Sequence, residues 1–548
     1  MANLSQIKRQ QMMDFLARIK EEYKDDDDML IAFSEIEAKL NAKKYGLVWE
    51  KHEEAVDVMM LNSIPVFRED FDKDITIDSD ARYNFLLEGD NLHSLRLLEK
   101  THKGKIDVIY IDPPYNLGSD FVYNDDYVGK EDAFRHSKWL SFMASRLKSA
   151  YWLLSENGVI FISINDTEYA NLRLLCDDIF SDINYQATLI WKSRQRADSR
   201  NMSMLSTDHE YILVYGKSAN FSLVGKEKDI SKYRNPDNDP RGPWASIDLS
   251  GLADASRRPN LHYDIVDPET GNVYPPNPNR GWSKSRKTIA KMISEKRILW
   301  PSSPKGRPRE KKFLKDLLSD KTGFSSVLDN EAVGYTTDGT RVLNDILGTR
   351  VFNFPKSVKL IKILIGQFPE KSCVVLDFFA GSGTTAQAVL ELNKEDDGNR
   401  RFIICTNNEN NICEKVTYPR VKTVITGKRE DGSVYSAGIP ANLKYYRTDF
   451  VSKNEEYLAD ALLVHITEMV QLEHSVKLDG KRYLLVLTDS KADELAANWS
   501  GYPDVKVLYV SRDVLFTTEQ NALFRNVEIH IIPDYYFNIE LREVGESW

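Results

Sequence analysis

Four consecutive residues, Asp112-Pro113-Pro114-Tyr115, place a carboxylate beside two rigid prolines and an aromatic ring. An exocyclic amine on a nucleobase is a poor nucleophile because its lone pair is delocalised into the ring. The Asp112 carboxylate and the Pro113 carbonyl would accept its N–H bonds and direct that lone pair outward, and Tyr115 would stack on a base flipped out of the duplex. This chemistry needs positioning and electrostatics but no metal. We predict these four residues as catalytic; the alternative is an ordinary turn with a buried aromatic.

A second turn that could have a chemical role runs from Phe378 to Thr384. It lies between the strand-like run 373–377 and a helical segment at 386–393. Gly381 and Gly383 allow the backbone to approach a ligand closely, and a helix N-terminus can receive a polar group. Two glycines alone also fit a dinucleotide site, in which the third glycine is replaced here by alanine. The Gly-Lys-Ser/Thr of a nucleotide-binding loop is missing.

Strand-like runs must position these turns. The β-branched run Ile106–Ile111 predicts a buried parallel strand that ends at Asp112, and ligands bind at the carboxyl edge of such sheets. A short strand before Asp90 brings a further carboxylate to the same edge, where helix N-capping is the alternative role. After Tyr115, the polar loop 116–129 is predicted to close over a flipped base.

Composition bounds the class of protein. The 548 residues suffice for two to four domains with a real core, and their hydrophobic content of 42% is ordinary. Without a secretory leader or an apolar run long enough for a bilayer, we expect a cytoplasmic protein with no membrane segment. The four cysteines show no CxxC pairing, which favours buried free thiols over a metal site.

Charge is unevenly distributed along the chain. Residues 191–312 contain 24 Lys and Arg against 14 Asp and Glu, a local charge of +10 in a chain of net charge −10. A basic middle in an acidic protein indicates phosphate recognition, against the alternative of a solvated basic surface. We therefore predict DNA contacts from a basic loop and from a proline-rich segment beyond it, at Lys192, Arg194, Arg196, Arg257, Arg258, Lys284, Arg286 and Lys287.

Together, the DPPY turn, a long insert and the sequence Phe379-Ala-Gly-Ser-Gly-Thr-Thr385, in this order, resemble the β class of amino-group DNA methyltransferases. The resemblance covers roughly residues 80–450 and implies S-adenosylmethionine as methyl donor. It implies that Asp90 binds the adenine side of the cofactor, that Lys356 faces its methionine part, and that Glu409 binds its ribose. The implied cofactor-binding set is Asp90, Lys356, Asp377, Phe378, Phe379, Ala380, Gly381, Ser382, Gly383, Thr384 and Glu409.

The helical N-terminus and the sequence Lys444-Tyr-Tyr-Arg-Thr-Asp-Phe450 resemble the modification (Mod) subunits of type III restriction–modification systems. That resemblance implies double-stranded DNA as substrate, a homodimer, and a helicase–nuclease restriction subunit as partner. The expected fold is α/β, a Rossmann-like methyltransferase sheet with additions. The expected domains are a helical arm (1–75), a catalytic half (76–219), an irregular target-recognition domain (220–345), a cofactor-binding half (346–450) and a small α/β C-terminal domain (451–548).

The motif predicts methylation of the 6-amino group of adenine. Three alternatives remain open: methylation of the cytosine 4-amino group, which usually has serine in place of Asp112; a non-catalytic DNA-recognition subunit; and methylation of RNA or of a protein glutamine. The large basic insert favours duplex DNA.

Overall fold

The computed structural model describes residues 4–24, 26–41, 49–117, 134–197, 205–303, 305–533 and 536–543. The chain divides into two compact units, which we describe separately. The main unit comprises Met1–Ser222 and Ser326–Trp548, and the insert unit comprises Leu223–Ser325. The predicted loop 116–129 falls almost entirely outside the described residues, as 118–133 are not described.

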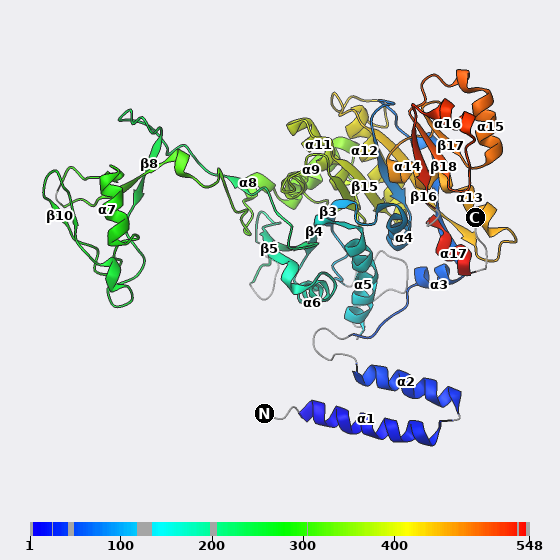
Figure 1. Cartoon of the computed structure of the whole chain (residues 1–548), viewed down its shortest axis with the longest axis horizontal. Coiled ribbons are helices and arrows are strands. Elements are labelled where there is room, and N and C mark those ends of the chain that lie inside the picture. Colours follow the sequence, from blue (N-terminus) through cyan, green and yellow to red (C-terminus); the bar gives the residue numbers. More distant parts are fainter. Residues whose placement is uncertain are drawn as a thin grey trace. The chain divides into compact units, whose positions relative to one another are not determined.

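A nine-stranded mixed sheet forms the centre of the main unit, in the order β1-β16-β2-β15-β14-β3-β4-β6-β5 (Figure 1). The strands β16, β2, β15, β14, β3 and β4 run parallel to their neighbours, whereas β1 on one side and β6 and β5 on the other are antiparallel. Their bounds are β1 Ser63–Glu69, β2 Tyr83–Glu88, β3 Ile106–Ile111, β4 Leu154–Ile164, β5 Tyr185–Trp191, β6 Glu210–Gly216, β14 Val374–Asp377, β15 Arg401–Thr406 and β16 Asn442–Ser452.

Helices cover both faces of this sheet. Connections between parallel strands are almost always right-handed, so helices that lead toward β4 and helices that lead toward β16 lie on opposite faces. The first group is α4 Asn91–His102, α5 Arg135–Leu153 and α6 Tyr169–Phe180; the second is α9 Thr336–Leu347, α10 Val358–Ile365, α11 Thr384–Asp396 and α12 Tyr418–Thr426. Because both faces are covered, β2, β3, β14 and β15 are apolar and buried along almost their whole length. This is the α/β Rossmann-like sheet expected from the sequence.

The predicted helical arm at 1–75 is only partly helical. It contains α1 Leu4–Glu22, α2 Asp27–Asn41 and α3 Ala55–Asn62, but Ser63–Glu69 forms β1, which pairs antiparallel with β16. The prediction of a wholly helical segment was therefore wrong. A buried ionic contact joins the two strands, since the Lys444 ammonium on β16 bonds to the carboxylates of Glu69 and Asp74, the latter at 3.2 Å.

Residues 451–548 continue the main unit. Helices α13 Leu458–Leu463, α14 Ile466–His474 and α17 Asn538–Glu543 contribute side chains to the same apolar core as the large sheet. A separate parallel sheet is formed by β17 Tyr483–Val486, β18 Val507–Ser511 and β19 Glu528–Ile532, with α15 Asp489–Ala497 and α16 Thr518–Phe524. None of the described helices is both long and apolar enough to cross a membrane.

Among the described residues of the insert unit, drawn in green in Figure 1, the strands are short and there is one α-helix. They are β7 Lys226–Glu227, β8 Trp244–Asp248, β9 Ile265–Val266, β10 Val273–Tyr274, α7 Arg286–Ser294, β11 Ile298–Leu299, β12 Arg309–Phe313 and β13 Lys321–Thr322. The unit ends at Ser325 rather than at the predicted residue 345. The reason is that α8 Asn330–Val333 and α9 pack against α10 and α12 of the main unit.

Candidate active site

The two predicted turns lie side by side at one edge of the sheet. Strand β3 leads into Asp112 and β14 leads into Phe378, and the two strands are parallel neighbours, with Val375 beside Val108 and Leu376 beside Ile109. Parallel neighbours end at the same edge, so the DPPY turn and the glycine turn face one region. This is the carboxyl edge at which open α/β sheets bind ligands.

A compact cluster of polar side chains surrounds the DPPY turn. The Lys356 ammonium lies 2.9 Å from Asp112 Oδ1, 3.0 Å from Glu210 Oε2 and 2.8 Å from the Tyr115 hydroxyl. The Tyr115 hydroxyl itself lies 2.8 Å from Asp112 Oδ1 and 2.9 Å from Glu210 Oε2. Two carboxylates therefore share one ammonium. The Lys356 side chain is only 10% exposed, whereas Asp112 keeps 28%, which leaves its carboxylate accessible to a ligand.

The electrostatics of the cluster favour the charged forms of Lys356 and Glu210 but not that of Asp112. Burial disfavours a charged Lys356, but Asp112 and Glu210 outweigh it and raise the pKa of the ammonium above its ordinary value. Burial would also raise the pKa of Glu210, yet the charge and hydrogen bond of Lys356 hold it below its usual range. For Asp112 burial dominates, and its pKa is raised because Lys356 offsets that effect only in part and the Glu210 charge adds to it. The carboxyl of Asp112 is thus the more basic of the two.

The DPPY turn is fixed from behind by buried side chains. Trp139 on α5 is fully buried and donates its indole N–H to the Pro114 carbonyl over 2.7 Å. Asn116 adopts a left-handed conformation, with φ 59°, and donates its side-chain amide to Glu168 over 2.5 Å. Glu168 is fully buried and also contacts His136 Nδ1 at 2.6 Å. The position of the DPPY turn is therefore set by α5 and by the residue that precedes α6.

The glycine turn is a tight loop with two left-handed residues, Gly381 (φ 48°) and Gly383 (φ 77°). A Cβ built at Gly383 would lie 3.2 Å from Thr417 Cγ2, so the position favours glycine for space as well as for conformation. Asp377 accepts hydrogen bonds from the Phe379 N–H (3.0 Å) and from the Thr385 hydroxyl. Burial raises the pKa of Asp377 to about 7, and the nearby charge of Asp112 contributes to the rise. The two turns are thus coupled electrostatically.

Arg420 on α12 binds the glycine turn. It is fully buried and donates to Ser382 Oγ (2.9 Å), to Thr384 Oγ1 (2.8 Å) and to Gln387 Oε1 (2.9 Å). The hydroxyl oxygens of Ser382 and Thr384 thus accept from Arg420, and both side chains are buried. The backbone of the turn remains as the part that could contact a cofactor.

The other predicted cofactor residues are placed in different ways. Asp90 caps α4, accepting from the Leu92 N–H over 2.7 Å, and also lies 3.4 Å from the buried guanidinium of Arg146. Phe378 is fully buried and its carbonyl accepts a hydrogen bond from Asn91. Phe379 and Ala380 are 5% and 6% exposed, and Glu409 is half-buried in the turn after β15. All follow the carboxyl ends of β2, β14 or β15.

The predicted DNA contacts fall on both units. Lys192, Arg194 and Arg196 are exposed in the segment after β5 of the main unit. The insert unit carries the remaining five: Arg257, Arg258, Arg286 and Lys287 are exposed, and Lys284 is half-buried.

Three residues of this site escaped prediction from sequence. Glu210 starts β6, and because β6 runs antiparallel to β4 its first residue lies at the edge where the parallel strands end. Trp139 and Arg420 lie on helices whose apolar pattern gives no sign of a polar role. Only an acidic residue at the start of a strand, together with that strand's direction, could have signalled Glu210.

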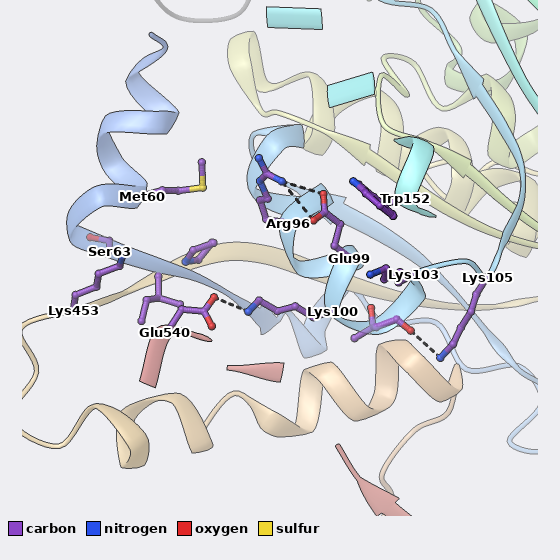
Figure 2. A pocket seen from close by; sticks show the side chains of 13 residues that line it. Met60, Ser63, Arg96, Glu99, Lys100, Lys103, Lys105, Trp152, Lys453 and Glu540 are labelled. Carbon is purple, nitrogen blue, oxygen red and sulfur yellow. Dashed lines mark hydrogen bonds and ion pairs between the residues drawn. The ribbon is translucent and has the colours of Figure 1, made fainter. Parts of the chain in front are cut away.

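Among the described residues, the cysteines, the possible metal ligands and a cavity do not form a second candidate active site. All four cysteines are buried and free. Across the described ranges, no group of three or more His, Cys, Asp or Glu side chains could hold a metal ion. A cavity of about 780 Å³ is lined by Arg96, Lys103, Trp152 and others (Figure 2), but its charges are partly paired, as in Lys100–Glu540 at 2.6 Å and Arg96–Glu99 at 3.1 Å. It contains none of the predicted site residues.

Comparison with known proteins agrees with this geometry. Residues 106–418 match the model of a family described as DNA methylase. The chain is 33% identical over 441 residues to the type III restriction–modification enzyme StyLTI Mod subunit of Salmonella typhimurium, covering 73% of this chain and 65% of that protein. It is 31% identical to the EcoPI Mod subunit of Escherichia phage P1, covering 69% and 66%.

A shorter relative matches over most of its own length. The type II methyltransferase M.KpnI of Klebsiella pneumoniae is 34% identical over 353 residues, covering 60% of this chain and 82% of that protein. By contrast, the chain spans about two thirds of the length of the Mod subunits that it matches. The family model covers both predicted turns and the insert between them, and the chain belongs to the DNA methylase family.

Proposed function

We propose that the protein transfers a methyl group from S-adenosylmethionine to the 6-amino group of a flipped adenine in duplex DNA. The observation that carries the proposal is the adjacency of β3 and β14, which brings the DPPY turn and the glycine turn to one sheet edge. Asp112 and the Pro113 carbonyl would accept the N–H bonds of the amine, and Tyr115 would stack on the base. Asp112, Pro113, Pro114 and Tyr115 are the proposed catalytic residues.

The residues present fit S-adenosylmethionine, whose bound sulfonium supplies the methyl group. The cluster of Asp112, Glu210 and Lys356 carries two negative charges and one positive charge when all three are ionised, which suits a cationic ligand. The backbone of Gly381 to Gly383 would hold the methionine part, and Asp90 and Glu409 would hold the adenine and ribose.

Charge development in the reaction suits the same groups. Bound S-adenosylmethionine would supply the methyl group and leave as a neutral thioether, so positive charge would build on the amine nitrogen that accepts the methyl. The net negative cluster stabilises this charge. The carboxylate of Asp112, whose pKa is raised, would then accept at Oδ the proton that the nitrogen releases. It would pass this proton to water. Lys356, by pairing with Asp112 and Glu210, would orient Asp112 rather than take the proton.

A methyl-transfer assay with isotopically labelled S-adenosylmethionine tests this proposal. Duplex DNA, RNA and protein serve as separate acceptors, and digestion of the product identifies the methylated base. We expect N6-methyladenine in duplex DNA only. Label in cytosine, in RNA or in protein would replace the proposal with one of its alternatives, and no label in any acceptor would favour a non-catalytic recognition subunit.

Substitution of Asp112 by alanine gives the second arm of this test. Since the carboxylate acts on the amine and not on the cofactor, Asp112→Ala should reduce turnover by about 10³-fold or more. Cofactor affinity, measured by calorimetry, should change little. A variant with near-normal turnover would contradict the proposed role of Asp112.

We further propose that the protein is the modification and specificity subunit of a type III restriction–modification system. The likeness to the StyLTI and EcoPI Mod subunits supports this assignment. A homodimer and a helicase–nuclease partner would follow from it. Light scattering of the purified protein tests the dimer, and co-purification with the product of a neighbouring gene tests the partner. A monomer that elutes alone would contradict both.

A further inference from the structure

Helix α7 of the insert unit exposes a face that combines basic and small side chains. Ile289 and Met292 are buried in the apolar core of the unit, together with Trp282 and Ile298. The opposite face is exposed and consists of Lys287, Ala290, Lys291 and Ser294, with Arg286 at the first turn. Small residues at 290 and 294 let another molecule approach the helix axis between the basic side chains.

Positive charge is concentrated around this helix. Residues 280–312 contain 12 Lys and Arg but only two acidic residues, Glu295 and Glu310. Glu295 lies at the C-terminal end of α7, where it pairs with Arg297 at 2.9 Å and with Lys291 at 3.7 Å. Within the described part of the chain, Arg286 and Lys287 form no ion pair, although Arg286 lies over the Tyr263 ring at 5.1 Å.

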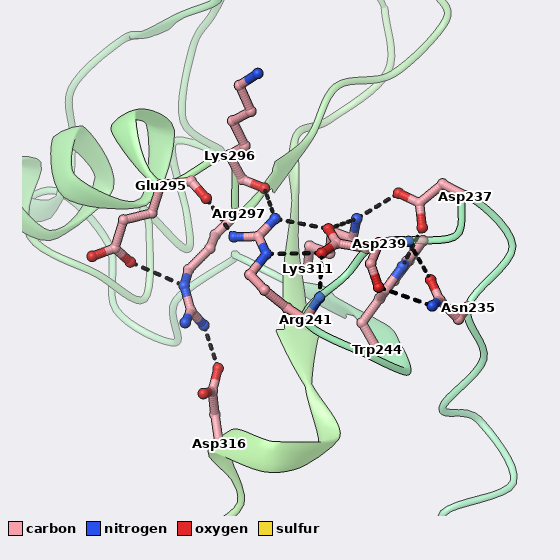
Figure 3. Close-up of polar contacts among 10 residues, drawn as sticks. All are labelled: Asn235, Asp237, Asp239, Arg241, Trp244, Glu295, Lys296, Arg297, Lys311 and Asp316. Carbon is pink, nitrogen blue, oxygen red and sulfur yellow. Dashed lines mark hydrogen bonds and ion pairs between the residues drawn. The ribbon is translucent and has the colours of Figure 1, made fainter.

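A network of ion pairs fixes the C-terminal end of α7 (Figure 3). Arg241 donates to the carbonyls of Glu295 (2.6 Å) and Lys296 (3.2 Å). Carbonyls at the end of a helix lack a backbone N–H partner within the helix, so the guanidinium takes its place. The same guanidinium forms a two-point contact with Asp239, at 2.9 and 2.8 Å, and Asp239 also binds Lys311 of β12 at 2.6 Å. The helix is thereby held rigidly on the β8–β12 strands.

The negative charges of the acidic side chains in this network are balanced by their basic partners. The hydrogen bonds from Arg241 and Lys311 hold the pKa of Asp239 well below its ordinary value, and the pKa of Asp237 is held low by Lys311 and Trp244. Arg297 likewise binds Asp316. The carboxylates Asp237, Asp239 and Asp316 are therefore compensated by partners outside the exposed face of α7, where only Lys291 pairs with a carboxylate within the described residues.

A second basic segment is joined to the start of the helix. The Tyr263 hydroxyl donates to the Lys284 carbonyl over 2.8 Å, and the Trp282 N–H donates to the Leu261 carbonyl over 2.9 Å. These bonds align the segment 257–263 with the residues that lead into α7. The exposed Arg257 and Arg258 thus belong to the same part of the insert unit as Arg286 and Lys287.

We propose that α7 is the element of the insert that enters the major groove of the target duplex. The inference rests on the proposed function and names the part of the chain that recognises the sequence. A helix of about 10–12 Å diameter fits a groove about 12 Å wide, and its charge complements the phosphates on both sides. Arg286 and Lys287 contact base edges, Lys291, Arg257 and Arg258 contact phosphates, and Ala290 and Ser294 allow the close approach.

Substitutions on the exposed face test the inference in the full-length protein. Arg286→Gln and Lys287→Gln should each weaken binding to the cognate duplex about 10- to 100-fold and relax the set of methylated sites. Lys291→Gln should weaken cognate and random duplexes alike and lower the salt dependence of binding by about one ion. Ala290→Glu places a carboxylate in the groove and should abolish cognate binding. Sequencing of methylated genomic DNA reports the sites.

Lys232→Gln provides the matched control, since Lys232 is an exposed lysine of the same unit outside both α7 and the 257–263 segment. This variant should keep the affinity and the methylated sites of the unmodified protein. Cofactor affinity should be unchanged throughout, which verifies folding of the main unit, and an unchanged far-ultraviolet circular dichroism spectrum and thermal transition should verify folding of the insert unit. Should the Arg286, Lys287 and Ala290 variants bind and methylate as the unmodified protein does, α7 is not the recognition element. If the unmodified protein itself did not methylate DNA, the proposed function would be refuted instead.

Discussion

At the scale of single residues, the central feature is Lys356, whose ammonium lies within 3.0 Å of both Asp112 and Glu210. A lone ammonium beside Asp112 would keep that carboxylate strongly ionised and a weak acceptor. Burial raises the pKa of Asp112, Lys356 offsets this rise only in part, and the Glu210 charge adds to it. We infer that Glu210 is a positioning residue, which affects the pKa of Asp112 directly by its charge and through Lys356.

Replacement of Glu210 by glutamine should reveal this tuning. Without the Glu210 charge, Lys356 binds Asp112 alone and the pKa of Asp112 falls. In the proposed mechanism methyl transfer needs ionised Asp112, so activity should be lost as the pH falls through that pKa. In Glu210→Gln the acidic limb of the kcat–pH profile should therefore move to lower pH, while kcat at neutral pH falls about tenfold.

The exposed Glu370 precedes β14 at the opposite edge of the sheet and serves as the matched control. Glu370→Gln should leave the pH profile where it is. If the acidic limb of Glu210→Gln stayed in place or moved to higher pH, Glu210 would have no influence on Asp112.

Sequence reasoning at this scale identified residues on the two turns but not those that hold them. The DPPY turn and the glycine turn are recognisable because proline and glycine restrict or widen backbone freedom in ways that a ligand site uses. Glu210 and Arg420 could not be found in the same way. Their roles depend on strand direction and on burial, which no local pattern encodes.

At the scale of elements, the glycine turn between β14 and α11 is tightly constrained. Gly383 adopts φ 77° with Thr417 packed against it, and Arg420 fixes the side chains on either side. The turn is thus rigid before any ligand arrives. Rigid preorganisation lowers the ordering cost of binding.

Gly383→Ala should therefore harm both stability and binding. The left-handed conformation costs an alanine about 1–2 kcal/mol, and the new methyl group would press on Thr417. We expect a lower free energy of unfolding in urea by at least about 1 kcal/mol and weaker S-adenosylmethionine binding. Gly501→Ala is the control, because a methyl group at Gly501 would meet no atom within 4 Å and the φ of this glycine is not positive; it should change neither quantity. Equal behaviour of the two variants would exclude a special role for Gly383.

Most elements of the sheet were predictable, since strands such as β3, β4, β14 and β15 are apolar runs bounded by turn residues. Strand β1 was missed because Ser63–Glu69 follows helical periodicity without a turn signal and contains a proline, which is tolerated here at an edge strand. Its partner β16 carries Lys444 in the middle of an aromatic run. The fully buried lysine is explained only by Glu69 and Asp74 across the strand pair.

At the scale of the whole molecule, the chain leaves the main unit after Ser222 and returns at Ser326. The returning segment adds to the edge of the sheet, where the Leu328 N–H donates to the Ile190 carbonyl over 3.0 Å and the Ile190 N–H donates to the Ser326 carbonyl over 2.7 Å. Trp191 then donates to the Gly334 carbonyl over 2.9 Å. All nine strands of the large sheet lie outside the insert.

Deletion of the insert should therefore spare the fold and the cofactor site. Replacement of residues 223–325 by a short flexible linker should leave a cooperative thermal transition and S-adenosylmethionine binding, while DNA binding is lost. A longer deletion through residue 347 is the control, because it removes α8 and α9, which pack on α10 and α12. The longer deletion should unfold the protein. An unfolded product from the shorter deletion would show that the two units depend on each other.

The contact between Ile190 of β5 and the returning segment 326–328, which we call the seam, also bears on how such enzymes could diversify. Because the insert leaves the main unit after β6 and returns beside the edge strand β5, a foreign module of different length could begin and end at the same two points without altering the register of any interior strand. New sequence preferences could then arise by recombination at this seam, with the chemistry inherited intact. Ser222 and Ser326 are the natural junctions for chimaeras that mark chosen genomic sites.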